Sequence, residues 1–584
     1  MAFGLSQNNK VPDMESTVLE TEKTEVSDVV KSSTVEDVEV NNTNTKPEPL
    51  SWQTYAAILT LMFQYNSYLF TLSMPPAILA FINADLGPDS NYIWITVSWN
   101  LCAAVLVTTS GRIADIFGRR WFLITGACIG VIGAIVGATA KNIPTMIASG
   151  ILFGIGGGFQ EMCFSAVQEL VPNRQRFFLL GCLEVSNMPA QFSALIAYAF
   201  VAHSSIGWRA CYWWCFSWEV SSAILLFLFY YPPSFETKHQ VDHKTKLQLL
   251  TELDYVGLVL FSAGCAIILM GINWGGSLHP WKSAACIAPI VIGGASLIAL
   301  GFWEVYADLK YPILPPKLFR QWRSFTAVLA VVFVGGMLYY SNAVLWPRIS
   351  TLLFVPADDL ILRGLYANMS AFAVMVAAIY CMAVMPWVGH EQWQLIGLAC
   401  LQTAFIGGFS SLKIHEKGKA IAFLLIAGAA ASSVNQIAFG MVSLGIEDQT
   451  DIGVAVGLVS TSRLLGGAVA SAIYVAIYTN KFSEEIPGHI ADVAAATGFQ
   501  GSTSALLAAA IKNTEAAYEA VPGITANIIS ACQLAVKYAY VDAFSLTYKV
   551  AIAFGGAAII ASLCTRNVEQ KKKSNDRAVR LENE

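Results

Sequence analysis

Apolar runs of about twenty residues recur from Tyr55 almost to the end of this 584-residue chain, and they constrain its fold more than any other feature. A helix needs about 20 mostly apolar residues to cross the hydrocarbon core of a bilayer. The chain has 55% hydrophobic and 13% charged residues, whereas soluble domains carry roughly 25% charged residues. The sequence therefore predicts an all-α integral membrane protein.

Polar, glycine and proline clusters divide the apolar runs into about fourteen segments. We place these spans at residues 54–82, 92–111, 120–140, 144–168, 177–202, 209–231, 255–273, 283–305, 324–346, 361–385, 393–412, 419–441, 453–478 and 544–565. The pattern predicts a 6+2+6 arrangement. In it, two six-helix halves at residues 51–232 and 307–566 flank two extra helices at residues 254–306.

Four segments are too polar to enter the membrane. Residues 1–50 are acidic and poor in aromatic residues, which is typical of a disordered tail, and no cleavable signal peptide precedes the first span. We expect this tail, a linker at residues 233–253 and a second tail at residues 567–584 to be cytoplasmic. Residues 480–542 form an external loop in this topology, and their alanine-rich and helix-like runs suit a segment on the membrane surface.

Lysine and arginine residues in the short loops set the expected orientation, because cytoplasmic loops are enriched in them. They gather after the second, fourth, sixth, eighth and last spans: Arg112, Arg119, Arg120, Arg174, Arg176, Lys238, Lys244, Lys246, Lys317, Arg320, Arg323, Lys571, Lys572 and Lys573. The loops after spans 10 and 12 are poor in both residues, so the rule is weaker in the second half. Both termini are predicted to be cytoplasmic.

The sequence shows none of the usual signatures of an enzyme or a metal site. Its twelve cysteines are scattered singly, without a CxxC pair or a histidine cluster. Glycine-rich phosphate loops, nucleophile elbows and basic nucleic-acid patches are missing too. We therefore expect a protein that is not an enzyme, with no cofactor, no metal and no nucleic-acid partner.

The loop after the second span reads GRIADIFGRR and carries Gly111, Asp115, Gly118, Arg119 and Arg120. This spacing resembles the loop signature of the major facilitator superfamily; the alternative is a simple basic loop. We expect Gly111 to let a helix end tightly. Asp115 is expected to accept hydrogen bonds from the unpaired backbone N–H groups at the start of a helix, or to pair with an arginine. The two arginines would hold the cytoplasmic face.

The wider stretch from Gly111 to Arg176 resembles the fungal trichothecene efflux pump family, within the fourteen-span drug:proton antiporter branch of that superfamily. The resemblance covers residues 50–566, and LDYVGLVLFSAG, GINWGG and HPWKS near the extra helices fit the same branch. It implies a proton-coupled exporter. The branch usually carries an arginine in span 4 where this chain has Gly150, although the GIGGG run at 154–158 remains and suits close helix packing.

Three acids inside predicted spans are candidates for a functional role: Glu161, Glu184 and Glu219. An ionisable residue there costs about 2.5 to 3.5 kcal/mol, so each suggests a function, here proton coupling. Glu161 is the first candidate, because it follows the glycine run; the alternative is that each acid is a hydrogen-bonded packing residue. For Arg463, near the cytoplasmic end of span 13, we expect the side chain to snorkel to lipid phosphates.

Polar and aromatic residues in four spans are candidates for the lining of a midplane cavity. They are Gln64, Tyr65, Asn66, Tyr68, Asn187, Gln191, Tyr339, Tyr340, Asn342, Asn435 and Gln436. An apolar pocket with a few placed polar groups suits a small amphipathic organic molecule. Each residue taken alone could equally be a helix-packing contact.

These features predict an alternating-access transporter, and the resemblance implies that it exports a toxin, drug or secondary metabolite in exchange for protons. We expect it as a multi-pass protein of the plasma membrane, with the vacuolar membrane as the alternative location. Two other functions stay open: import of a ferric siderophore, and sensing without transport on the same fold.

Overall fold

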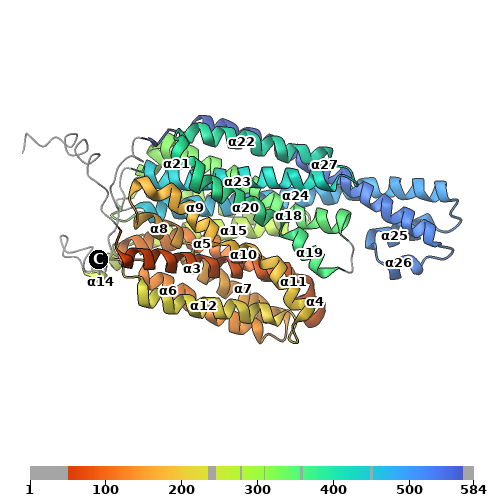
Figure 1. Ribbon diagram of the computed structural model, residues 1–584, viewed down its shortest axis with the longest axis horizontal. Helices are drawn as coiled ribbons and strands as arrows, with labels where there is room; N and C mark the ends of the chain where they lie inside the picture. The colour runs from red at the N-terminus through yellow and green to blue at the C-terminus, as the bar shows by residue number, and fades with distance from the viewer. Residues whose placement is uncertain are drawn as a thin grey trace, which may run out of the picture.

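The computed structural model describes residues 50–233, 245–275, 279–307, 309–355, 359–446 and 451–569. Almost all of the predicted acidic tail, half of the 233–253 linker and most of the 567–584 tail lie outside these residues. Every named element within them is a helix. The all-α prediction is therefore confirmed, and most helices run along the long axis of one bundle (Figure 1).

The N-terminal half contains ten α-helices and two short 3-10 turns. They are α3 (Trp52–Ala77), α4 (Leu79–Leu86), η2 (Ser90–Ile93), α5 (Trp94–Phe117), α6 (Arg120–Ala138), α7 (Ile143–Gln160), α8 (Cys163–Glu169), η3 (Asn173–Gln175), α9 (Arg176–Ser186), α10 (Met188–Gln191), α11 (Ser193–His203) and α12 (Arg209–Phe229). A short helix α14 (Lys246–Thr251) then leads into the two extra helices, α15 (Tyr255–Trp274) and α16 (Ala284–Tyr306).

The C-terminal half is also a series of helices, and the long helices α24 and α27 lie near its end. Its elements are α17 (Pro316–Arg320), η4 (Trp322–Thr326), α18 (Ala327–Ile349), η5 (Ser350–Phe354), α19 (Leu360–Ala367), α20 (Met369–Ile379), η6 (Tyr380–Val384), α21 (Met385–Val388), α22 (Glu391–Gly408), η7 (Phe409–Ser411), α23 (Lys417–Gly445), α24 (Ile452–Thr497), α25 (Thr503–Lys512), α26 (Glu515–Glu519) and α27 (Ala526–Leu563).

Twelve helices in the described residues are long and apolar enough to cross a membrane, and the bent pair α3 and α4 would make a thirteenth. The fifth predicted span, residues 177–202, is instead divided into α9, α10 and α11. Pro189 lies at the start of α10, and a proline cannot donate a hydrogen bond to the carbonyl four residues earlier. The count of fourteen spans therefore stays a prediction.

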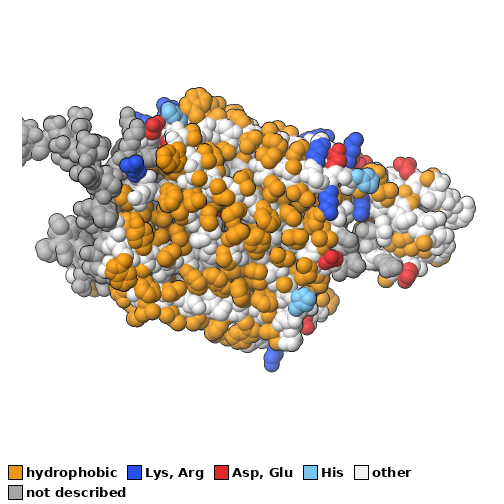
Figure 2. Space-filling model, in the orientation of Figure 1, with side chains coloured by type: hydrophobic (Ala, Val, Ile, Leu, Met, Phe, Trp, Pro, Cys, Tyr) orange, Lys and Arg blue, Asp and Glu red, His pale blue; other side chains and the backbone are white. Residues whose placement is uncertain are grey.

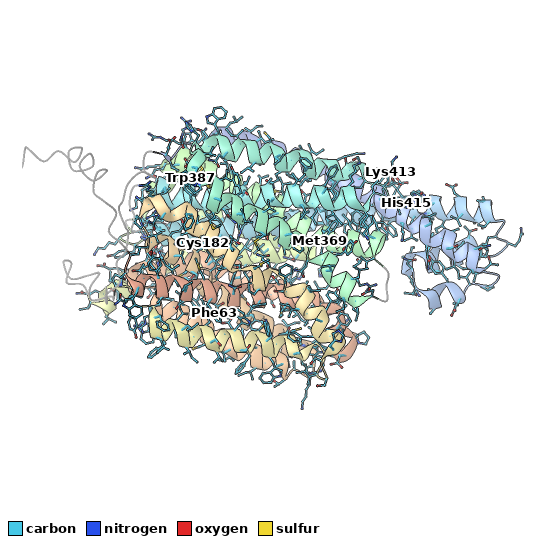
Figure 3. All side chains as sticks on the ribbon, in the orientation of Figure 1. Phe63, Cys182, Met369, Trp387, Lys413 and His415 are labelled. Atoms are coloured by element: carbon cyan, nitrogen blue, oxygen red, sulfur yellow. The ribbon has the colours of Figure 1, made fainter. Side chains whose placement is uncertain are left out.

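Hydrophobic side chains cover the middle of the visible face of the bundle, whereas charged side chains gather toward its ends (Figure 2). This is the distribution expected for a protein surrounded by lipid. Trp387 lies at one end, and Lys413 and His415 lie toward the other, near the projecting helices (Figure 3). The two ends therefore correspond to opposite sides of the membrane.

The segment at residues 480–542 differs from the predicted surface-lying loop. Its two boundaries fall inside α24 and α27, which continue beyond the rest of the bundle and carry α25 and α26 (Figure 1). The projection has an apolar core of its own that includes Ile486, Ile490 and Leu506, and the rings of Phe482 and Tyr540 stack at 4.1 Å between α24 and α27. The apolar side chains that suggested contact with a membrane are used for packing between these helices.

Candidate functional site

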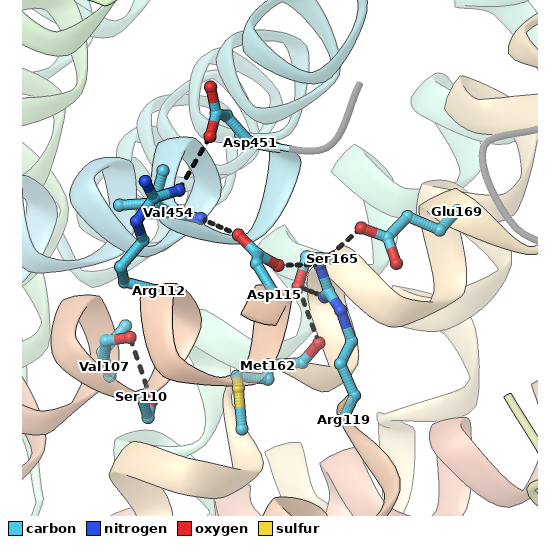
Figure 4. A network of polar contacts seen from close by, with 10 residues as sticks. All are labelled: Val107, Ser110, Arg112, Asp115, Arg119, Met162, Ser165, Glu169, Asp451 and Val454. Carbon is cyan, nitrogen blue, oxygen red and sulfur yellow. Dashed lines mark hydrogen bonds and ion pairs between the residues drawn. The ribbon is translucent and has the colours of Figure 1, made fainter. Parts of the chain in front are cut away.

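Asp115 joins the two halves (Figure 4). It lies at the end of the bundle that carries Arg112, Arg119 and Lys317, which we call the basic end. Its Oδ2 accepts a hydrogen bond of 2.9 Å from the backbone N–H of Val454, in the first turn of α24. That N–H has no partner within its own helix, and the helix dipole favours an anion there. Asp115 Oδ1 accepts from Arg119 at 2.8 Å. Both contacts predicted for Asp115 are therefore made.

Asp451, directly before α24, forms ion pairs with two cations at the same end. Arg112, buried on α5, donates to its Oδ1 at 2.8 Å, and the Lys317 ammonium lies 2.6 Å from its Oδ2. Arg119, also buried, contacts Glu169 on α8. These charge-assisted contacts hold α5, α8, α17 and α24 together.

Gly111 does not end a helix, contrary to the sequence prediction. Helix α5 continues to Phe117, and Gly118, with a φ of +93°, follows it as the cap. A Cβ atom on Gly111 would lie 2.7 Å from the carbonyl oxygen of Gly453. Glycine is needed here because the backbones of α5 and α24 touch, a contact that depends on the other half and is invisible in the local sequence.

Two more arginines at the basic end have different roles. Arg120 stays within the N-terminal half, where its guanidinium stacks 3.8 Å from the centroid of Tyr231 and donates to the carbonyl of Phe227. Arg176, fully buried on α9, donates at 2.8 Å to the carbonyl of Ser443 in the last turn of α23. The halves are thus linked at a second place, between α9 and α23.

Beyond these contacts lies a cavity of about 470 Å³ between the two halves. Of the predicted cavity residues, those that line it are Tyr65, Tyr68, Gln191, Tyr339, Asn435 and Gln436. The acid Glu184 on α9 lines it as well. The prediction omitted Asn100, Asn273, Ser432 and Arg463, which come from α5, α15, α23 and α24. Their signal in the sequence was a polar side chain within an apolar run.

Three other candidates are structural contacts of the N-terminal half. The Asn66 amide donates to the carbonyls of Met62 and Ser186 at 3.0 and 2.9 Å, which ties α3 to the end of α9 beside Asn187. Gln64 contacts Ser222 on α12. None of them is in the cavity lining.

In the C-terminal half, Asn342 is buried outside the cavity lining. The side chain of Tyr340 lies outside the described part of the chain.

Glu161 and Arg463 form an ion pair across the interface between the halves. Arg463 donates to Glu161 Oε1 at 2.9 Å, and the Tyr68 hydroxyl donates to Oε2 at 3.1 Å. The side chain of Arg463 is 15% exposed and that of Glu161 is 1% exposed. The guanidinium also lies 5.5 Å from the ring centroid of Phe439. The predicted snorkelling of Arg463 is therefore wrong, because this face of α24 meets a buried acid instead of lipid.

Glu219 is separate from the other two acids. It is fully buried inside the N-terminal half, where its Oε2 accepts from Gln160 at 2.7 Å. A Cβ atom on Gly130 would lie 2.6 Å from its carboxyl carbon, so the glycine makes room for the acid. Glu219 does not line the cavity. This environment matches the packing alternative.

Gly150 stands where the antiporter branch usually has an arginine, and its surroundings leave no room for one. A Cβ atom there would lie 2.3 Å from the carbonyl oxygen of Ile95, because α7 packs directly on α5. The guanidinium beside the cavity comes from Arg463 on α24.

Comparison with solved structures shows the fold. A human organic anion transporter matches with a TM-score of 0.51 and 11% identity, covering 86% of this chain and 99% of the other. A proton:xylose symporter of the major facilitator superfamily matches with a TM-score of 0.50 and 14% identity, covering 88% and 98%. The predicted major facilitator fold is therefore confirmed.

Comparison of sequences shows the family. A trichothecene efflux pump of Fusarium sporotrichioides is 30% identical over 86% of this chain and 84% of its own length. An MFS-type transporter of Penicillium rubens is 27% identical, covering 90% and 94%. The model of the fungal trichothecene efflux pump family matches residues 50–576. The chain therefore belongs to the fungal trichothecene efflux pump family.

Proposed function

We propose that this protein is a secondary active transporter that exports a small amphipathic toxin, drug or secondary metabolite across the plasma membrane in exchange for protons. Family membership supports export, and two relatives, from Fusarium sporotrichioides and Trichoderma arundinaceum, are named trichothecene efflux pumps. The cavity, with its aromatic and amide side chains, supports an amphipathic organic substrate.

The observation that carries proton coupling is the ion pair of Glu161 with Arg463, because it joins the halves next to the cavity. A proton on Glu161 removes one of the two charges and therefore the attraction. The halves must separate at one end and meet at the other in alternating access. A proton at this position thus weakens a contact that has to break.

A cycle follows from this arrangement. With the basic end closed by the Asp115 and Asp451 contacts, Glu161 receives a proton from outside and releases Arg463. The halves then open toward the cytoplasm, where the proton leaves and the substrate enters. Re-formation of the ion pair accompanies the return and outward release. Each turnover moves a proton inward and the substrate outward.

The proton gradient can sustain this export. One proton gains about 2.3 kcal/mol per 100 mV and about 1.36 kcal/mol per pH unit. With about 100 mV and two pH units, the sum of roughly 5 kcal/mol supports a solute ratio of a few thousand.

The test uses the full chain in proteoliposomes with an acidic lumen. Only vesicles in which the basic end of the protein faces the external buffer are kept. We expect a labelled trichothecene, or another member of a panel of fungal toxins, to accumulate inside and to leave when a protonophore is added. Absence of gradient-dependent accumulation for the whole panel would contradict the proposal. Uptake of a labelled ferric chelate by cells that express the protein would instead indicate a siderophore importer.

A further inference from the structure

A second cavity lies at the side of the bundle, away from the ion pair. It has a volume of about 810 Å³ and is bounded by α15 and α16 on one side and by α17, α18 and α24 on the other. Its wall is mostly apolar and includes Cys265, Leu300 and Leu465. Gly301 on α16 and Arg320 on α17 are exposed at its rim. The cavity is therefore a groove that opens on the surface, and we call it the lateral groove.

The surface around the lateral groove is suited to lipid. Among the twelve candidate spans, α16 is the least buried, with 17% of its most apolar window inside the protein. Ile298, Phe302 and Val305 are exposed on this helix. Water in an apolar groove lacks hydrogen-bond partners, and an empty groove loses dispersion contacts. A hydrocarbon chain therefore fits the lateral groove better than water does.

The rim adds a positive charge. Arg320 belongs to a stretch with two other cations, but Lys317 pairs with Asp451 and Arg323 donates to the carbonyl of Cys564. No ion pair of Arg320 is seen in the part of the chain that the structure describes, and its side chain is exposed. Trp322, 55% exposed, lies two residues later, and exposed tryptophans are typical of the head-group region.

The acid on the groove wall, Glu304, is bonded to the protein backbone and not to Arg320. Glu304 is buried, and its Oε1 accepts from the backbone N–H of Leu314 at 2.9 Å. This bond holds the loop before α17 against the groove. The charge offered at the rim is thus that of the Arg320 guanidinium, which favours a phosphate.

We propose that the lateral groove binds one acidic phospholipid of the cytoplasmic leaflet, with an acyl chain along the apolar wall and the phosphate on Arg320. The chain would contact Leu458 and Leu465 on α24, the helix that also carries Arg463. The lipid therefore connects the two extra helices with the C-terminal half. This binding site is independent of the transported substrate.

The experiment measures lipids retained by the full-length protein in native mass spectrometry after incubation with equal amounts of phosphatidylglycerol and phosphatidylcholine with identical chains. We expect about fivefold preference for phosphatidylglycerol, the effect of one favourable charge contact near the surface. Arg320→Gln should abolish this preference. Arg174→Gln, which removes an exposed arginine that does not line the groove, should keep it.

A second pair of variants tests the acyl-chain site. Nothing lies within 4 Å of a Cβ atom placed on Gly301 or on Gly294, two turns earlier on the same helix. Gly301→Trp fills the lateral groove and should reduce retention of both lipids, whereas Gly294→Trp should retain them. Equal retention of the two lipids by the unaltered protein, an unchanged preference in Arg320→Gln, or equal retention in the two tryptophan variants would overturn the proposal.

Discussion

Glu161 and Arg463 are 302 positions apart in the sequence, and their side chains meet at 2.9 Å beside the central cavity. Glu161 follows α7 of the N-terminal half and Arg463 lies on α24 of the C-terminal half. An ion pair in this low-dielectric position is strong only while both charges are present, and removal of one partner leaves an unpaired buried charge. The pair therefore connects the charge state of one acid with the contact between the halves.

The first prediction is a coupling between these residues in thermal stability. Glu161→Gln and Arg463→Gln should each lower the unfolding temperature of the purified protein, because each leaves its partner without a counter-charge. The double variant should lose less than the sum of the two, by about 0.5 to 3 kcal/mol, as for contacting residues in general. Additive losses in a double-mutant cycle would show that the pair does not interact in the folded protein.

The second prediction concerns the contact of α5 with α24. Gly111→Val places a side chain where a Cβ atom already meets the Gly453 carbonyl oxygen at 2.7 Å, so the basic end cannot close fully. We expect export at least about tenfold slower, since a misfit of about 1.4 kcal/mol in one state changes its population tenfold. Gly294→Val is the matched control, because that position is open. Equal export rates of the two variants at equal surface amount would contradict the expected role of Gly111.

The third prediction concerns the charge on Asp115. Asp115→Asn keeps the size of the side chain but weakens its bonds to the Val454 N–H and to Arg119. Hydrogen bonds to charged groups are worth about 1.5 to 3 kcal/mol, so we expect export to fall by about one order of magnitude while the protein stays in the membrane. Arg174→Gln is the control for a charge change at the same end. An unaltered rate in Asp115→Asn would remove Asp115 from the closing mechanism.

Features that depend on local sequence could be predicted, and features that depend on the rotation of helices could not. The apolar runs gave the positions of most spans, and the loop spacing indicated Asp115. The depth of Arg463 in its span can be counted along the chain and indicates the lipid head groups, whereas its partner lies in the other half. The sequence predicts a helix end at Gly111 for the same reason, since its actual neighbour is Gly453 on α24.

Polar residues inside spans show the same limit. Gln64, Tyr65 and Asn66 are consecutive, but successive residues of a helix point in different directions. Tyr65 therefore lines the cavity, while Asn66 and Gln64 bind neighbouring helices. An apolar run predicts that such residues are within the membrane, and it does not state which neighbour each one faces.

The fourth prediction is the side of the membrane on which the projection at residues 480–542 lies. The positive-inside rule places it outside, together with Lys413 and His415 at the same end of the bundle (Figure 3). A protease site inserted after Asn513, between α25 and α26, should be cut in intact cells. A site inserted after residue 570, in the predicted cytoplasmic tail, is the control and should be cut after permeabilisation. The reverse pattern would invert the topology and with it the expected direction of transport.

The last prediction separates Glu161 from Glu219, two of the three acids that the sequence proposes for proton coupling. Glu161 meets a cation of the other half beside the cavity, whereas Glu219 accepts from Gln160 inside one half. Glutamine keeps the size and one acceptor of each side chain but cannot exchange a proton. Glu161→Gln should therefore abolish accumulation driven by a pH gradient in proteoliposomes and retain substrate binding. Glu219→Gln should keep both, with the protonophore response intact. If Glu161→Gln still concentrates substrate against its gradient, the ion pair is a structural contact and proton coupling belongs to another residue, with Glu184 on the cavity wall as the next to test.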